Sequence, residues 1–359
     1  MSYIILPDTL YSWPWPRRIN QHYSETKVKL DAWIHSTKIL DAKAQNAFDK
    51  CDFVLLASLC YPHLHRDQLR VAGELMMLFF LFDECTDKVD GESVGPYINM
   101  VIDALEHPEV TPPEDCPCDL REITRQFWLR ATSVAPLASR IRFKKTFIEY
   151  IKAVAFEAHD RLDNNIRSID DYLQLRRLTA GGYPSLFPID FAVDIPNEVM
   201  QHPTLSTLNG LVAESLILLN DVYSYNIEQA SGHHAHNLVT VVMHELNVPI
   251  QDALEWIRRY HTECLERFLA LKGTLPSWGV TVDQDVQRYV EGLAEGVRGI
   301  DTWCFESQRY FGPKGLQVQQ TRIVPLLSRV SADVATPMTV SEVAAVAPHV
   351  AEADMAAKL

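Results

Sequence analysis

The stretch "FFLFDECTD", Phe79 to Asp87, places an apolar helical run directly before three acidic residues. The three acids, Asp83, Glu84 and Asp87, lie within five residues of one another, and Lys88 is the one basic side chain nearby in the sequence. Burying a carboxylate without a compensating partner is costly. The cluster is therefore either exposed to solvent or neutralised by a cation that comes to it.

The bulk composition predicts a folded globular protein. The chain has 359 residues, is 47% hydrophobic and carries a formal net charge of −14. This length allows a large core and one or two domains. The negative charge argues against general nucleic-acid binding, which needs a basic surface. It leaves open an anionic small-molecule substrate, provided that metal ions supply positive charge locally.

The cysteine pattern and the amino-terminal segment indicate a compartment. The seven cysteines are scattered and show no C-x-x-C spacing, which favours free thiols in a reducing environment. Cys116 and Cys118 flank a proline in an expected loop, and metal binding by this pair is the less favoured alternative. The start, "MSYIILPDTLYSWPWPRR", lacks the long apolar core of a secretory signal. We expect a cytoplasmic protein with no membrane span.

Helical periodicity dominates the chain and predicts an all-α fold. Apolar residues recur at three- and four-residue steps in "TKVKLDAWIHSTKIL", "SRIRFKKTFIEYIKAVAFEAHDRL" and other segments. Turn clusters such as "GGYPSLFP" and "KGTLPSWG" separate them, and alternating strand-like runs are nearly absent. We expect a single-domain helical bundle around a central cavity, spanning residues 1–322. Residues 323–359, rich in Ala and Val, are expected to form a loose tail or flexible lid.

A second polar cluster lies in "LILLNDVYSYNIEQ". Asn220, Ser224 and Glu228 are four residues apart, so a helix places them on one face with neighbouring Cβ atoms about 6 Å apart. Asp83 and Asp87 of the first cluster share a face for the same reason. Carboxamide, hydroxyl and carboxylate oxygens suit Mg²⁺, which keeps several waters and accepts phosphate oxygens. This pattern predicts a magnesium site.

Each cluster alone is also compatible with an ordinary solvated polar stripe. The presence of both clusters in one chain favours metal binding. Both clusters end markedly apolar helical segments, both offer only oxygen ligands, and enough chain separates them to place them on opposite walls of one bundle. Two facing acidic walls need cations between them. The sequence therefore predicts Mg²⁺ between the walls and a hydrophobic pocket below.

At these residues the chain resembles class I terpene cyclases, specifically the sesquiterpene synthases of basidiomycete fungi. The aspartate-rich motif of that family, D(D/E)xxD, reads here as Asp83, Glu84 and Asp87. The second metal motif of the family, (N/D)Dxx(S/T)xxx(D/E), reads here as Asn220, Asp221, Ser224 and Glu228. The resemblance covers roughly residues 5 to 315.

Two further segments carry the resemblance. The family has a diphosphate-sensing arginine upstream of the second motif, and "LRRLTAGGYPS" matches it, with Arg177 preferred and Arg176 the alternative. A carboxy-terminal Arg-Tyr pair is matched by Arg309 and Tyr310 in "SQRYFG". The chain departs from the pattern at Ile227, where the family often has a basic residue. One diphosphate contact is then missing or supplied elsewhere.

The resemblance implies ionisation of farnesyl diphosphate with three Mg²⁺ ions. Asp83, with Asp87 as a further candidate, would ligate two of the ions. The third ion would be held by Asn220, Ser224 and Glu228. The catalytic set would be Asp83 with the three diphosphate-binding residues Arg177, Arg309 and Tyr310. Both a monomer and a homodimer are compatible with the resemblance.

The carbocation formed in such a reaction must be kept from water. Aromatic faces stabilise a desolvated cation by about 0.5–2 kcal/mol each. Backbone carbonyls at Gly181 are a further candidate, because "AGGYP" should interrupt a helix. The alternative for the side chains is plain core packing. The candidate wall residues are Phe79, Phe80, Phe82, Leu216, Gly181, Tyr223 and Trp303.

The segment "ASGHHAHNLV" corresponds to a family loop that caps the pocket. His236 and Asn237 are then expected at the rim. Transition-metal binding by the histidines, His233, His234 and His236, is the less favoured alternative.

Two rival functions make different demands on the sequence from cyclisation. A chain-elongating prenyltransferase would carry aspartate-rich motifs on both walls, which the Asn-Ser-Glu pattern argues against. A non-enzymatic helical scaffold would not need both metal motifs. Within cyclisation, "WPWPRRINQHY" and "NDVYSYNIEQ" most resemble enzymes that close the farnesyl cation between carbons 1 and 11. The expected product is a protoilludene-type tricyclic hydrocarbon, and a germacrene- or cadinene-type product is the alternative.

Overall fold

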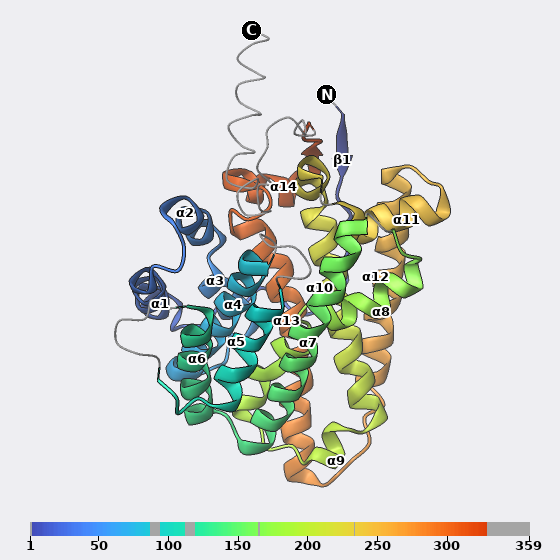
Figure 1. The fold of residues 1–359 in the computed structure, drawn as a ribbon. Helices are drawn as coiled ribbons and strands as arrows, with labels where there is room; N and C mark the ends of the chain where they lie inside the picture. The colour runs from blue at the N-terminus through green and yellow to red at the C-terminus, as the bar shows by residue number, and fades with distance from the viewer. Residues whose placement is uncertain (1, 87–93, 112–118, 164–165, 233, 329–359) are drawn as a thin grey trace.

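The computed structural model describes residues 2–86, 94–111, 119–163, 166–232 and 234–328. In these ranges the chain folds into fourteen α-helices, three short 3₁₀ helices and two short strands (Figure 1). The predicted all-α fold is confirmed. The α-helices are α1 (Tyr23–Thr37), α2 (Ala42–Cys51), α3 (Phe53–Cys60), α4 (Arg66–Thr86), α5 (Gly95–Glu106), α6 (Leu120–Val134), α7 (Leu137–Asp163), α8 (Ile169–Thr179), α9 (Asn197–Met200), α10 (Pro203–Ser231), α11 (Leu238–Leu246), α12 (Ile250–Lys272), α13 (Val280–Glu306) and α14 (Gly315–Thr321). The 3₁₀ helices are η1 (Pro184–Ala192), η2 (His234–His236) and η3 (Gly312–Lys314).

Several helices begin where a short polar side chain can cap them. The side chains of Asp41, Asp119, Ser168 and Asn237 accept hydrogen bonds from backbone N–H groups in the first turns of α2, α6, α8 and α11. Such caps satisfy donors that have no partner inside the helix. The sequence thus sets the starts of these helices locally.

The two strands form a small ribbon that the sequence did not predict. β1 (Tyr3–Ile5) pairs antiparallel with β2 (Ile323–Pro325), and Ile4 lies opposite Val324. These two side chains are buried on the bundle, while Tyr3, Ile5 and Ile323 face outward. Three-residue strands carry too little alternation to be recognised in a sequence.

The ribbon also bears on the expected tail. The expected boundary followed Arg322, but residues 323–327 pack against the bundle. Leu326 N donates to the carbonyl of Ser2 (2.9 Å), and Leu327 N donates to the side chain of Asn226 (3.0 Å). Of the expected tail, residues 329–359 lie outside the described part of the chain.

α4 is buried on nearly all sides, as its apolar sequence predicts. It packs against α1, α3, α6 and η1. Its one deeply buried acid, Glu74, is paired with Arg70 and Arg130. Near the carboxy-terminal end of α4, Phe80, Asp83 and Glu84 are all partly exposed. Phe80 lies three residues before Asp83 and four before Glu84, so its side chain is next to both acids on the helix surface.

α10 is the other central helix, and Figure 1 shows it beside α13 in the interior of the bundle. It packs against α12, α13, α8 and α11. Pro203 opens it in the first turn, where a missing N–H is tolerated, and Gly232 ends it in the left-handed conformation (φ 86°). The two apolar helical segments that end in the polar clusters are thus parts of long helices that are largely buried.

The helix is interrupted after α8, as "AGGYP" predicts. α8 ends at Thr179, and Gly181 adopts φ 67°, which favours glycine. A Cβ on Gly182 would lie 2.9 Å from the Cβ of Ala213, so the absence of a side chain lets this interruption approach α10.

None of the described helices combines the length and apolarity needed to cross a membrane. Cys51, Cys60, Cys264 and Cys304 are buried free thiols in the described part of the chain.

Candidate active site

The second motif and the Arg-Tyr pair come together in the structure. Nδ2 of Asn220 donates a hydrogen bond to the hydroxyl of Tyr310 at 2.9 Å. The two residues are far apart in the sequence and meet because α13 packs along α10 and the chain turns back after Glu306. Tyr310 is buried, which raises the pKa of its hydroxyl, so the phenol stays a neutral donor.

Arg309 connects this pair to the wall formed by α4. Its guanidinium lies over the ring of Phe80, with 4.3 Å from Cζ to the ring centroid. The ring of Trp303 lies behind, 5.9 Å from that of Phe80 and 5.8 Å from that of Tyr310. Arg309 and Tyr310 therefore bridge α4 and α10, helices that pack mainly against different neighbours.

The first motif lies on the last turn of α4. Tyr150 of α7 donates a hydrogen bond from its hydroxyl to Oδ1 of Asp83 at 3.2 Å. Asp83 and Glu84 are both partly exposed, whereas residues 71–79 of the same helix are all buried. Carboxylates at a helix carboxy-terminus face the negative end of the helix dipole, which makes a neighbouring cation favourable. The third residue of this motif, Asp87, lies outside the described residues.

Asn237, the first residue after η2, organises the second motif. Its Nδ2 lies 2.9 Å from Oε2 of Glu228, 3.3 Å from Oγ of Ser224 and 2.8 Å from the carbonyl oxygen of Asp221. The Asn237 side chain is fully buried. Ser224 and Glu228, both predicted metal ligands, thus contact the same nitrogen atom. Their side chains therefore lie on one face of α10, as their spacing predicts.

Asp221 has a structural role that the sequence did not reveal. It is 1% exposed, and its carboxylate accepts hydrogen bonds from Tyr172 Oη (2.6 Å), Leu238 N (3.0 Å) and Arg176 (3.2 Å). It therefore joins α10 to α8 and to the start of α11. An acid inside an apolar helical run must find such partners, and this was the available signal.

The two adjacent arginines of α8 point to different partners. Arg176 reaches the second motif, with Nη2 3.3 Å from Oδ1 of Asn220 and 3.2 Å from Oδ1 of Asp221. Arg177, the residue preferred from the sequence, forms an ion pair with Glu214 at 3.1 Å. Glu214 also accepts a hydrogen bond from Tyr260 of α12. Of the two, the alternative Arg176 is the one that contacts the motif.

The carboxyl of Glu228 has an altered proton affinity. Burial raises its pKa to about 7, and the nearby charge of Asp221 acts in the same direction. Hydrogen bonds from Ser224 and Asn237 oppose this shift. A partly buried carboxyl beside a second carboxylate, with amide and hydroxyl oxygens on the same stripe, is a donor set that fits a divalent cation with oxygen preference.

In the described part of the chain, no three His, Cys, Asp or Glu side chains gather closely enough to hold a metal by themselves. This agrees with a site that uses Asn and Ser and leaves positions for water and phosphate. His234 and His236 form η2 beside the motif, where the backbone carbonyl of His236 accepts from Tyr172. His233 lies outside the described residues. The alternative of a transition-metal site on these histidines gains no support.

The candidate wall residues divide into two groups. Phe79 and Phe80 lie near the first motif: Phe79 packs on Gly181, where a Cβ would be 3.2 Å from its ring, and Phe80 lies under Arg309. Tyr223 instead donates to Asp301 of α13 at 2.7 Å and is 1% exposed, so it belongs to the core. The Trp303 indole is likewise buried and donates to the carbonyl of Cys51.

The remaining wall candidates and the family departure can be placed as well. Phe82 is buried beside Tyr150, at 6.1 Å between ring centroids. Leu216 is partly exposed one turn before Asn220, on the same face of α10. Ile227 is 1% exposed and packs in the core, so its side chain offers no contact to a diphosphate.

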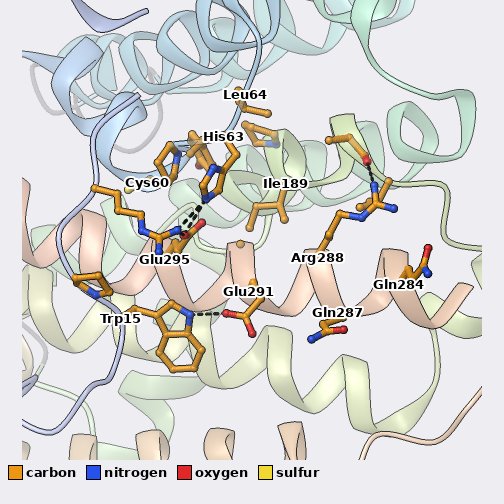
Figure 2. Close-up of a pocket in the computed structure, with 18 of the residues that line it drawn as sticks. Trp15, Cys60, His63, Leu64, Ile189, Gln284, Gln287, Arg288, Glu291 and Glu295 are labelled. Atoms are coloured by element: carbon orange, nitrogen blue, oxygen red, sulfur yellow. Dashed lines mark hydrogen bonds and ion pairs between the residues drawn. The ribbon is translucent and has the colours of Figure 1, made fainter. Parts of the chain in front are cut away.

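A separate cavity of about 810 Å³ opens away from these residues. Figure 2 shows it between the segment around Trp15, the turn at His63, η1 and the first half of α13. Glu295 accepts hydrogen bonds from Arg18 and His63 at its edge, and Glu291 accepts from Trp15. None of the predicted site residues lines this cavity.

Comparison with known proteins identifies the family. Residues 74–267 match the sequence model described as terpene synthase family 2, C-terminal metal binding. The chain belongs to the terpene synthase family. This match covers both metal motifs and more than half of the chain, and the predicted resemblance is confirmed.

Curated relatives of this terpene synthase are fungal enzymes. "Sesquiterpene synthase 14" of Postia placenta is 44% identical over 330 residues, covering 92% of this chain and 94% of the relative. "Delta(6)-protoilludene synthase 18" of the same fungus is 42% identical with the same coverage. "Delta(6)-protoilludene synthase" of Armillaria gallica is 40% identical and covers 94% of this chain and 97% of the relative.

Solved structures of terpene synthases share the fold. A cucumene synthase variant superposes with a TM-score of 0.70 at 22% identity, covering 83% of this chain and all of that chain. Germacradien-4-ol synthase from Streptomyces citricolor superposes with a TM-score of 0.70 at 23% identity, covering 81% of this chain and 98% of that chain.

The family match and the curated relatives show that this terpene synthase is a carbon–oxygen lyase that acts on a diphosphate. The family implies a divalent metal.

Proposed function

We propose that this terpene synthase is a sesquiterpene synthase that ionises and cyclises farnesyl diphosphate with Mg²⁺. The observation that carries the proposal is the hydrogen bond from Asn220 to Tyr310, which joins the second metal motif to the diphosphate-binding pair. The names of the curated relatives support the class of product. The fold and the metal-binding family support the class of reaction.

The metal-binding roles follow the two motifs. Asp83, with Asp87, would hold two of three ions on the α4 side. Asn220, Ser224 and Glu228 would hold the third on the α10 side, where Asn237 already contacts Ser224 and Glu228. Bound Mg²⁺ would neutralise negative charge on the diphosphate as it leaves. The number of ions is part of the proposal.

Three cationic or neutral donors are positioned for the diphosphate oxygens. Arg309 and Tyr310 lie between the two motifs, and Arg176 lies against Asn220. We assign to Arg176 the sensing role that the sequence resemblance gave to Arg177, because Arg177 is paired with Glu214. Planar guanidinium groups grip phosphate oxygens with two parallel hydrogen bonds. These donors would stabilise the charge that develops on the leaving group.

The reaction breaks the bond between carbon 1 of the substrate and its diphosphate oxygen. The electron pair leaves with the diphosphate, and the farnesyl chain keeps the positive charge. Phe79 and Phe80 lie next to the first motif and can shield that cation from water. Tyr223 and Trp303 act behind this wall as packing residues. Loss of a proton from the cyclised cation would complete the reaction.

The proposed product is a protoilludene-type tricyclic hydrocarbon formed through closure between carbons 1 and 11. Two relatives at 40–42% identity bear the name of such a synthase, and they cover more than nine tenths of this chain. Closure requires a wall that folds the chain so that its distal double bond lies over carbon 1. Phe79 and Phe80 are the residues proposed to impose that fold. A germacrene- or cadinene-type product is the alternative outcome.

Gas chromatography with mass spectrometry tests the proposal directly. The purified protein is incubated with farnesyl diphosphate and Mg²⁺, and a parallel reaction contains EDTA. We expect a metal-dependent hydrocarbon with fifteen carbons, mainly tricyclic. Adding isopentenyl diphosphate should not lengthen the chain, and a longer prenyl diphosphate would instead indicate a chain-elongating enzyme. A germacrene- or cadinene-derived main product would overturn the closure assignment while leaving the metal and diphosphate assignments in place.

A further inference from the structure

Asn237 combines two functions in one buried side chain. Its Oδ1 accepts a hydrogen bond from Val239 N at 2.9 Å and so caps α11. Its Nδ2 faces the second motif, 2.9 Å from Oε2 of Glu228 and 3.3 Å from Oγ of Ser224. A single amide therefore connects the start of one helix to two ligand side chains of another.

The orientation of this amide is fixed by its surroundings. If the oxygen and nitrogen exchanged places, the amide oxygen would face the carbonyl of Asp221 and the carboxyl of Glu228, both acceptors. The amide nitrogen would then face Val239 N, which is a donor. Both contacts would be repulsive, so only one orientation satisfies the hydrogen bonds. The Asn237 amide can donate only toward the motif.

The backbone of Asn237 is held as firmly as its side chain. Leu238 N donates to Oδ2 of the buried Asp221 at 3.0 Å. The carbonyl of Asn237 accepts from Val241 N at 3.1 Å in the first turn of α11. The donor nitrogen thus has little freedom to leave Glu228 and Ser224. Groups that fix ligand side chains in this way raise the affinity of a metal site, because the ligands need less ordering when the metal binds.

Asparagine is the side chain that meets both requirements. Serine, threonine and aspartate also cap helices well. None of them carries an N–H₂ group, and aspartate would place a second negative charge against Glu228. The helix cap by itself therefore does not explain this residue type, whereas the contact with Ser224 and Glu228 does.

We propose that Asn237 is a positioning residue for the metal site of α10: it holds Ser224 and Glu228 in their ligand arrangement before the ion arrives. The inference rests on the proposed function, which makes these two residues metal ligands. It adds a residue outside both metal motifs to the machinery of this terpene synthase. A carboxylate has lone pairs enough for a metal and a hydrogen-bond donor together, so Asn237 keeps its contact with Glu228 in the loaded site.

The test is Asn237→Ser, which keeps a helix-capping group and removes the amide donor. Pyrophosphate binding to the full chain is measured by isothermal titration calorimetry over a series of Mg²⁺ concentrations. The half-saturating Mg²⁺ concentration should rise about 10- to 100-fold, as is typical when a group that orients metal ligands is lost. Serine keeps the cap but not the buried hydrogen bonds of the amide, so the unfolding temperature without metal should fall while unfolding stays cooperative.

The matched control is Asp119→Ser at the start of α6, which alters the same kind of cap far from the motifs. It should leave the half-saturating Mg²⁺ concentration unchanged. Saturating Mg²⁺ should restore pyrophosphate affinity in Asn237→Ser, which damage to the fold would not allow. Asn237→Thr, which also caps and lacks the amide, repeats the measurement if the serine variant folds poorly.

The possible outcomes distinguish failure of the positioning role from failure of the proposed function. An unchanged Mg²⁺ dependence in both Asn237 variants, with normal binding in the unmodified protein, would overturn the positioning role alone. A failure of the unmodified protein to bind pyrophosphate with Mg²⁺ would instead overturn the proposed function. A shift in the Asn237 variants that Asp119→Ser does not reproduce supports both.

Discussion

The motifs on α4 and α10 both place oxygen-bearing side chains near the end of an apolar helix, but their surroundings differ. On α10, Asp221 and Ser224 are almost fully buried, and hydrogen bonds tie the motif to α8, α11 and the chain after α13. On α4, Asp83 and Glu84 are partly exposed on the last turn of the helix, and Asp83 accepts from Tyr150 of α7.

The two proposed metal-binding walls therefore differ in how their side chains are held. The α10 motif is held by hydrogen-bond donors from other elements, with Asn237 in contact with two of its proposed ligands and Arg176 in contact with Asn220. The α4 motif presents acidic groups at the edge of a buried helix, where they remain accessible. Changes on α10 should therefore alter both metal affinity and the stability of the metal-free fold, whereas changes at the α4 wall should act mainly on ligand binding.

The largest effect is expected for Glu228→Gln, which keeps the shape of the side chain and removes its charge. Turnover of farnesyl diphosphate, followed by pyrophosphate release, should fall by orders of magnitude while circular dichroism shows an intact fold. Glu214→Gln is the matched control, since it alters another buried acid of the same helix that is paired with Arg177. Near-normal turnover of the Glu228 variant at ordinary Mg²⁺ concentration would refute the metal role.

The next effect concerns stability without metal. The folded pKa of Glu228 is about 7 against an ordinary value of 4.5, so its stabilising contribution is complete below pH 4.5 and is lost as pH rises through 7. Relative to Glu228→Gln, the unmodified protein should lose up to about 3 kcal/mol of unfolding free energy between pH 5 and pH 8. Urea unfolding in EDTA measures this difference. Parallel pH profiles for the two proteins would contradict the raised pKa.

A smaller effect is expected at the α4 wall for Arg309→Lys. Lysine keeps the charge but loses the planar fork and the stacking on Phe80. Pyrophosphate binding with Mg²⁺ present should weaken by about 1–3 kcal/mol, as for other charged hydrogen bonds. Calorimetry is the measurement, and thermal unfolding checks the fold. Unchanged affinity would remove Arg309 from the diphosphate site.

The smallest effect discriminates between the neighbouring arginines of α8. Arg176→Lys should weaken pyrophosphate binding roughly five- to tenfold, since Arg176 contacts Asn220 and Asp221. Arg177→Lys should affect stability through its ion pair with Glu214 and leave pyrophosphate binding within about twofold. The reverse ranking would restore Arg177 to the sensing role and show that its pair with Glu214 opens when the ligand binds.

Much of the fold and of the second motif could be predicted from the sequence. Periodicity gave the helices, and the four-residue spacing of Asn220, Ser224 and Glu228 gave their common face, because helix geometry fixes both locally. The β1–β2 ribbon was missed, since three-residue strands leave no readable pattern. Tyr223 was placed on the cavity wall because helical phase alone cannot distinguish one buried side of α10 from another, and its partner Asp301 lies on α13.

Residue type and short-range spacing encode the family, the two oxygen-rich motifs and the helical scaffold, so these can be read from the chain alone. Which of Arg176 and Arg177 faces the motif depends on how α8 packs, since adjacent residues of a helix point about 100° apart. The tertiary structure also decides that Asn237 contacts Glu228 and that Tyr310 contacts Asn220. Those partners come from helices distant in the chain, and only the packing of α8, α11 and α13 around α10 brings them together.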